Sequence, residues 1–130
     1  MKEYIDKVLL KYLHAKPTHP QLTPHKHRKI KYGSKQQLSP ADDTSPDINA
    51  AGVKWIQAII GALLYYTRTI NNKLLVALSA IGAQQASATE ATDDSIKQLL
   101  YYVATYSNDV IVYRASDMVL SAHSEAGFQN

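Results

Sequence analysis

Apolar residues recur at helical spacing in four stretches of the chain. Residues 3–14 place their apolar side chains on one face, with Lys7 and Lys11 opposite, which predicts a short amphipathic helix that needs a partner surface. Residues 51–69 and about 73–85 repeat the pattern, with an asparagine pair between them, and a further helix follows. The predicted core positions are, in chain order, Ile5, Val8, Leu9, Tyr12, Leu13; Val53, Ile56, Ile60, Leu63, Leu64; Leu74, Leu75, Leu78, Ile81; and Ile96, Leu99, Leu100, Val103.

Local features refine these helices. Ser87 and Glu90 have the spacing of a capping box, which predicts that the last helix starts after Ser87. Asp93 and Asp94 then lie near the positive end of the helix dipole. Gly61 is small enough to permit close contact between helices. Three short helices with apolar stripes predict a small bundle.

The chain changes character between the first two helices. Residues 15–50 contain all five prolines, interleaved with His, Lys, Gln, Ser and Asp. Proline at these intervals excludes a continuous helix or a central strand, so we predict an extended connector with turns at 32–34 and 42–46. A connector of this length is unusual inside a compact domain, which indicates that it packs along a neighbouring domain or is mobile.

The tail switches to strand periodicity. Residues 110–113 indicate a strand, 114–117 a turn, and apolar and polar residues alternate from Met118 onward. No other segment is predicted to pair with the outer edge of this hairpin, so the sheet is unfinished. The pattern therefore predicts a mainly α fold with a small C-terminal β-hairpin.

Composition and charge narrow the function classes. The chain has no cysteine, no apolar run long enough for a membrane span and no signal-peptide pattern after Met1, so we expect an intracellular protein without a membrane partner. Residues 1–35 hold nine Lys/Arg against two acidic residues, whereas residues 36–130 hold five against nine. This asymmetry favours a polyanion facing the N-terminal third, with a solvated basic linker as the alternative.

The connector holds two candidate sites. The first is the basic run, residues 25–35, which can contact phosphates without reading bases, while its tyrosine can stack on a base. A solvated loop is the competing interpretation of this run. The pair His25-x-His27 could chelate a metal, but no third ligand stands at a defined spacing. The candidate nucleic-acid-binding residues are Lys26, Arg28, Lys29, Lys31 and Tyr32.

Several motifs follow one another in a distinctive order. They are Met1–Ile5, the Gly61-x-Leu63-x-Tyr65 core, LLVALSAIGAQQ over 74–85, TEAT over 89–92 with QLLYYVAT over 98–105, and HSEA over 123–126. This order resembles the reverse transcriptase to ribonuclease H junction of copia-type LTR retrotransposon polyproteins. The family has an MPGYI-like start, histidines around SPHxH, a G-x-L-x-Y helix, an LLVALS-x-I-x-x-QQ helix, a TEAT…QLLxYVAT helix and a strand pair ending in HSDA.

The resemblance implies a catalytic, metal-binding role for Glu125. The family has an aspartate at this position, where it helps to hold two divalent ions at the end of the first ribonuclease H strand. Glutamate is one methylene longer, and displacing its carboxylate by about 1 Å can cost on the order of a hundredfold in rate. A two-metal site also needs several carboxylates. An exposed glutamate at a strand end is therefore the competing interpretation of Glu125.

The resemblance also implies a domain organisation. Residues 1–14 would be a helix at the exit of the polymerase palm, 15–50 a Pro/His/Lys-rich connector, 51–107 a thumb- or connection-like bundle of three to four helices, and 108–130 the first strands of a truncated ribonuclease H-like sheet. The implied partners are an RNA–DNA or DNA duplex, bound weakly and without sequence preference, together with the palm and the rest of the ribonuclease H domain. The implied location is a cytoplasmic particle or the nucleus of the host.

The parent enzyme would be an RNA-directed DNA polymerase and ribonuclease H that uses Mg²⁺. This fragment is expected to need no cofactor and to be inactive, because both active sites are incomplete. The alternative is a free-standing helical protein-interaction module with the basic segment as a tether. The unfinished sheet and a first helix without a partner favour the fragment.

Overall fold

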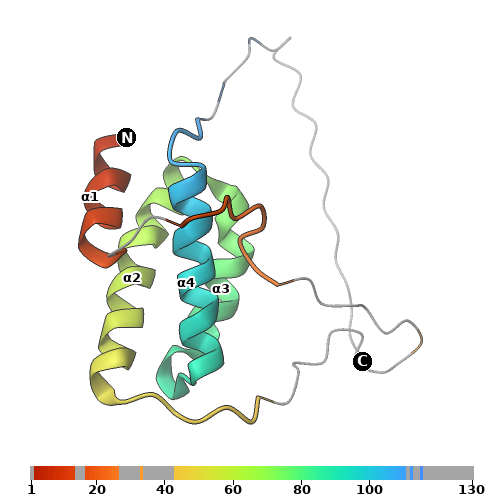
Figure 1. The fold of residues 1–130 in the computed structure, drawn as a ribbon. Coiled ribbons are helices and arrows are strands. Elements are labelled where there is room, and N and C mark those ends of the chain that lie inside the picture. The colour runs from red at the N-terminus through yellow and green to blue at the C-terminus, as the bar shows by residue number, and fades with distance from the viewer. Residues whose placement is uncertain are drawn as a thin grey trace.

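The computed structural model describes residues 2–13, 17–26, 33, 43–110, 112 and 115, and these are mainly helical. The elements are α1 (Lys2–Tyr12), α2 (Ala50–Thr69), the 3-10 turn η1 (Asn72–Leu74), α3 (Leu75–Gln84), the 3-10 turn η2 (Gln85–Ser87) and α4 (Glu90–Thr105). Figure 1 shows α2, α3 and α4 side by side, with α1 alongside α2. The predicted helical bundle is confirmed. The predicted hairpin and ribonuclease H-like strands lie almost entirely outside the described residues.

Short polar residues set the ends of α2. The side chain of Asn49 caps the helix by accepting the amide of Gly52 at 2.8 Å. At the other end, the amides of Ile70 and Asn71 both donate to the carbonyl of Tyr66, at 2.9 and 3.2 Å. This shared acceptor ends the helical ladder at the predicted asparagine pair, and the chain turns into η1.

The core lies between α2, α3 and α4. The predicted buried face of α4 is confirmed, because Ile96, Leu99, Leu100 and Val103 are all buried. The prediction for α2 and α3 is partly wrong, since three predicted core residues of α2 are only half-buried, one of α3 is exposed, and others replace them. Helix α2 contacts α1, α3 and α4, so its buried face is wider than one stripe. The residues that leave the core are Val53, Ile60, Leu64 and Leu75, and those that enter it are Ile59, Tyr66 and Ala77.

Helix α1 has a partner within the chain, which corrects the expectation that it has none. Ile5 is completely buried and Val8 is 6 % exposed. The hydroxyl of Tyr4 donates to the carbonyl of Ala62 on α2 at 2.8 Å, and its ring meets that of Tyr65 edge-on at 5.8 Å. Helix α1 packs on both α2 and α4 and closes one side of the core.

Gly61 does not serve helix packing. A Cβ atom built there would meet nothing within 4 Å among the described residues, and the residue is exposed. The predicted close helix contact at Gly61 is therefore wrong.

A polar junction ties the C-terminal ends of α2 and α4 together. The side-chain amide of Asn71, a residue that is 5 % exposed, donates to the carboxylate of Asp109 at 2.8 Å. Lys73 adds an ion pair to the same carboxylate oxygen at 3.4 Å. Burial raises the pKa of the nearby Tyr66 hydroxyl above its ordinary value of 10.0. None of the described helices is both long and apolar enough to cross a membrane.

The packing of α1 yields a direct test. Replacing Ile5 by alanine removes a fully buried side chain and is expected to lower the free energy of unfolding by about 2–5 kcal/mol. The matched control is Leu10→Ala on the same helix, where the side chain is 83 % exposed and the change is expected to stay within about 0.5 kcal/mol. Urea denaturation of both variants measures the difference. Equal effects would contradict the docking of α1 on the bundle.

Candidate nucleic-acid interface

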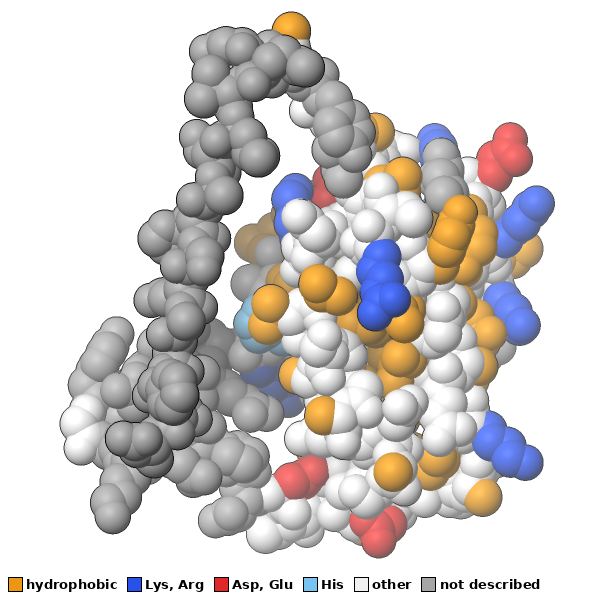
Figure 2. Space-filling model, turned by 180° about the vertical axis from the view of Figure 1, so that it is seen from behind, with side chains coloured by type: hydrophobic (Ala, Val, Ile, Leu, Met, Phe, Trp, Pro, Cys, Tyr) orange, Lys and Arg blue, Asp and Glu red, His pale blue; other side chains and the backbone are white. Residues whose placement is uncertain are grey.

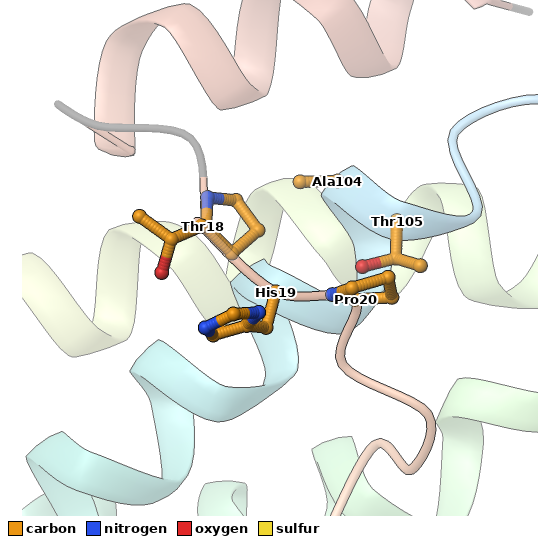
Figure 3. Close-up of a pocket in the computed structure, with 6 residues that line it drawn as sticks. Thr18, His19, Pro20, Ala104 and Thr105 are labelled. Carbon is orange, nitrogen blue, oxygen red and sulfur yellow. The ribbon is translucent and has the colours of Figure 1, made fainter.

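The first described part of the connector, residues 17–26, crosses the C-terminal half of α4 (Figures 1 and 3). The amide N–H of Gln21 donates to the hydroxyl oxygen of Thr105 at 3.0 Å, and that hydroxyl donates to the carbonyl of Tyr101 at 2.8 Å. The side-chain amide of Gln98 donates to the carbonyl of Thr23 at 3.2 Å. We call this set of contacts the first anchor. It holds the connector on α4 just before the basic run begins.

A shallow pocket of about 360 Å³ lies at this crossing. Its lining comprises Pro17, Thr18, His19 and Pro20 of the connector with Ala104 and Thr105 of α4, and Figure 3 shows Pro20 beside Thr105. The Thr105 hydroxyl is already engaged in the first anchor. The lining residues hold no nucleophile paired with a base, so we assign this pocket no catalytic chemistry.

The second described part of the connector caps the N-terminus of α4. An α-helix leaves its first amides without intrahelical partners, and here connector residues accept two of them. Thr89 is the N-cap residue and accepts a third. The three bonds are Glu90 N–H to the Pro46 carbonyl at 3.0 Å, Ala91 N–H to the Ser45 hydroxyl at 3.2 Å, and Thr92 N–H to the Thr89 hydroxyl at 3.4 Å.

We call these contacts the second anchor, together with the amide of Ile48, which donates to the carbonyl of Ala88 at 3.1 Å. The predicted capping box of Ser87 and Glu90 is wrong. Ser87 belongs to the 3-10 turn η2 that extends α3, and the cap falls two residues later, with Thr92 in the reciprocal position.

The carboxylate of Asp43 holds the second anchor together. It accepts the amide and hydroxyl of Ser45 and the hydroxyl of Thr89. The bond from the Ser45 amide forms an Asx turn, so the turn predicted around 42–46 is confirmed for Asp43–Ser45. Hydrogen bonds from Ser45 and Thr89 lower the pKa of Asp43 below its ordinary value of 3.8.

Both anchors lie on one helix, which brings residues 23 and 45 of the connector near each other. Thr23 is held at Gln98 and Ser45 at Ala91, positions about 10 Å apart along the axis of α4. The basic run lies between them in the sequence. His25 and Lys26 follow the first anchor and are exposed to solvent.

The other candidate residues lie outside the described part of the chain. These are Arg28, Lys29, Lys31 and Tyr32 of the basic run, His27 of the histidine pair, and Glu125.

Charge on the described surface is unevenly distributed. Residues 50–88 contain Lys54, Arg68 and Lys73 and no acidic residue. Figure 2 shows Lys and Arg side chains down the right-hand edge and elsewhere on this face, with acidic side chains at the upper right and at the lower end. Five acidic residues belong to the second anchor or lie close to it in the sequence, and we call them the acidic group. They are Asp43, Asp47, Glu90, Asp93 and Asp94.

The metal sites that the sequence suggests depend on His27 and Glu125, which lie outside the described residues. No three His, Cys, Asp or Glu side chains among them come together as a metal site. Sequence reasoning missed the residues that build the two anchors, namely Gln21, Thr23, Gln98 and Thr105 in the first, and Asp43, Ser45 and Thr89 in the second. The only signal was the turn motif at 42–46, because the other contacts join residues far apart in the sequence.

The second anchor predicts a pH dependence of stability. Because the folded-state pKa of Asp43 is lowered, its contribution is present above the unfolded pKa of about 4 and is lost as the pH falls through the folded value. Asp43→Asn is therefore expected to lower the unfolding midpoint at pH 7, with a difference from wild type that shrinks below pH ~4.

The control is Asp94→Asn, which changes an exposed carboxylate on α4 that makes none of the contacts of the second anchor. Its difference from wild type should vary less with pH. Thermal denaturation from pH 7 to pH 3 separates the two variants, and a constant Asp43→Asn difference over that range would count against the anchor.

Comparisons of the chain with family models, with curated proteins and with solved structures find no match.

Proposed function

We propose that this chain is a non-catalytic fragment of a retrotransposon reverse transcriptase/ribonuclease H polyprotein that positions the RNA–DNA template–primer duplex. The order of motifs from Met1–Ile5 to HSEA over 123–126 supports the parentage. In this proposal the helical bundle is the thumb- or connection-like part, residues 108–130 begin the ribonuclease H-like sheet, and Glu125 stands at the position of its first aspartate. Mg²⁺ would be held by the parent enzyme.

The observation that carries the duplex-binding role is the first anchor. Gln21 and Thr23 are fixed on α4, and the chain then leaves the helix surface at the exposed residues His25 and Lys26. A basic segment that starts from a fixed point loses less conformational freedom on binding than a free tail does. The anchor therefore supports binding of a polyanion by the run Lys26, Arg28, Lys29 and Lys31.

The chemistry of this contact is electrostatic. Lys and Arg side chains that neutralise phosphates release bound counterions, so affinity falls steeply with salt and carries no sequence information. The acidic group beside the second anchor repels a polyanion, which favours an approach from the first anchor and the C-terminal half of α4.

A second candidate function is a helical protein-interaction module. Helix α3 contains no charged residue, and two of its apolar side chains reach solvent, with Val76 69 % and Leu75 39 % exposed. The docking of α1 also removes one argument against an autonomous module. A partner helix would bind this uncharged face, and the basic segment would act as a tether.

Duplex binding is tested by changing the four cations Lys26, Arg28, Lys29 and Lys31 to alanine. We expect affinity for an RNA–DNA hybrid at 50 mM salt to fall on the order of tenfold or more, with a salt-dependence slope reduced by about 3 to 4. Fluorescence anisotropy at several salt concentrations measures both quantities.

The matched control changes Lys2, Lys7, Lys11 and Lys54 to alanine, which alters the net charge equally but leaves the basic run intact. This control should retain more affinity and more of the slope. Equal binding by the wild type and the first variant at low salt would exclude the positioning role, and equal losses in both variants would show that net charge alone attracts the duplex.

A further inference from the structure

A modification motif coincides with the first anchor. Thr23 is followed by Pro24, and the basic Lys26 stands three residues after Thr23. Proline directly after a phosphoacceptor, with a basic residue at the third position, is the substrate pattern of one class of proline-directed Ser/Thr kinases. Two other Ser-Pro pairs, at Ser39 and Ser45, lack the basic residue at that position. The sequence thus distinguishes Thr23 from the other candidates in the connector.

The structure presents this motif to solvent. Thr23 and Lys26 are both exposed, and residues 20–26 form no helix or strand. The proline restricts Thr23 to extended conformations, which suits a substrate that binds a kinase groove as an extended peptide. Ser45 is a poorer acceptor, because its hydroxyl donates to Asp43 and accepts the amide of Ala91 in the cap of α4.

Among the described residues, the Thr23 hydroxyl oxygen is held only by long side-chain hydrogen bonds. It accepts from the side-chain amides of Gln98 at 3.4 Å and Gln21 at 3.5 Å. The stronger contact of the first anchor goes to the Thr23 backbone carbonyl. The hydroxyl can therefore be modified while the backbone contact that positions the segment remains.

We propose that Thr23 is a phosphorylation site for a proline-directed Ser/Thr kinase and that its phosphorylation weakens duplex binding by the adjacent basic run. The Thr23 hydroxyl oxygen attacks the γ-phosphorus of ATP, the bond from that phosphorus to the bridging oxygen of ADP breaks, and the hydroxyl proton passes to the kinase. The product is phosphothreonine and ADP.

The electrostatic consequence follows from the position of Thr23. Phosphothreonine carries a charge of about −1.5 to −2 at pH 7, three residues from Lys26. The four cations of the basic run lie within the next eight residues, so the phosphate offsets roughly half of their charge and adds an anion that repels the duplex. The assignment of Thr23 as a phosphorylation site rests on the sequence motif and on the exposure of Thr23, whereas the effect on duplex binding rests on the proposed function.

The test uses the full 130-residue chain, ATP with Mg²⁺ and a purified cyclin-dependent kinase–cyclin complex, followed by mass spectrometry of the phosphopeptides. We expect near-complete modification of Thr23, no label there in Thr23→Ala, and at least tenfold slower labelling in Pro24→Ala. Ser45→Ala should leave Thr23 labelling unchanged. Absence of label on Thr23, or labelling of Thr23 and Ser45 at equal rates, would overturn the proposed site.

The phosphorylated chain is then titrated with the RNA–DNA hybrid at 50 mM salt. We expect at least a fivefold loss of affinity relative to the unmodified chain, and recovery of the original affinity once a phosphatase removes the phosphate. Unchanged affinity after full modification would overturn the regulatory role. If the unmodified chain does not bind the hybrid, the proposed function and its regulation fail together, while label on Thr23 still establishes the modification site.

Discussion

The structure depends on helix α4, which uses its opposite faces for different purposes. Its apolar face, with Leu99 and Leu100 completely buried, seals the core against α2 and α3. Its polar groups bind the connector at two places: Thr105 and Gln98 form the first anchor, and the N-terminal amides form the second. A single amphipathic helix thereby fixes both the bundle and two separate points of the connector, at residues 21–23 and 43–48. Loss of α4 packing would release the two together.

This arrangement changes how the two proposed functions compare. Helix α1 buries Ile5 and Val8 within the chain, so the bundle does not need a polymerase palm to cover that side. A thumb- or connection-like element that folds by itself can still act within a larger polyprotein, because positioning a duplex requires a rigid support rather than a complete active site. The exposed Val76 on the uncharged helix α3 is the feature that a protein partner would explain better than a duplex does.

Sequence periodicity anticipated the helices because each has one apolar face, and it identified the buried residues of α4. It failed where burial depends on several neighbours: α2 is covered on more than one side, so Ile59 and Tyr66 joined its predicted core. It also placed the cap of α4 at Ser87, because a capping motif does not reveal that η2 would continue α3 through that residue. Sequence periodicity could not predict the anchors, because hydrogen bonds such as that from Gln98 to Thr23 join residues 75 positions apart.

The central claim is that α4 holds the connector at both ends, and native-state amide hydrogen exchange tests it most directly. The Gln21 amide donates to the Thr105 hydroxyl and the Ala91 amide to the Ser45 hydroxyl, and neither has a backbone acceptor in the part of the chain that the structure describes. The account predicts that both amides exchange markedly more slowly than unstructured peptides do, and that Asp43→Asn lowers protection at Ala91 but not at Gln21. Exchange of both amides at unprotected rates, alongside well-protected amides in the core of α4, would show that the bundle folds without holding the connector.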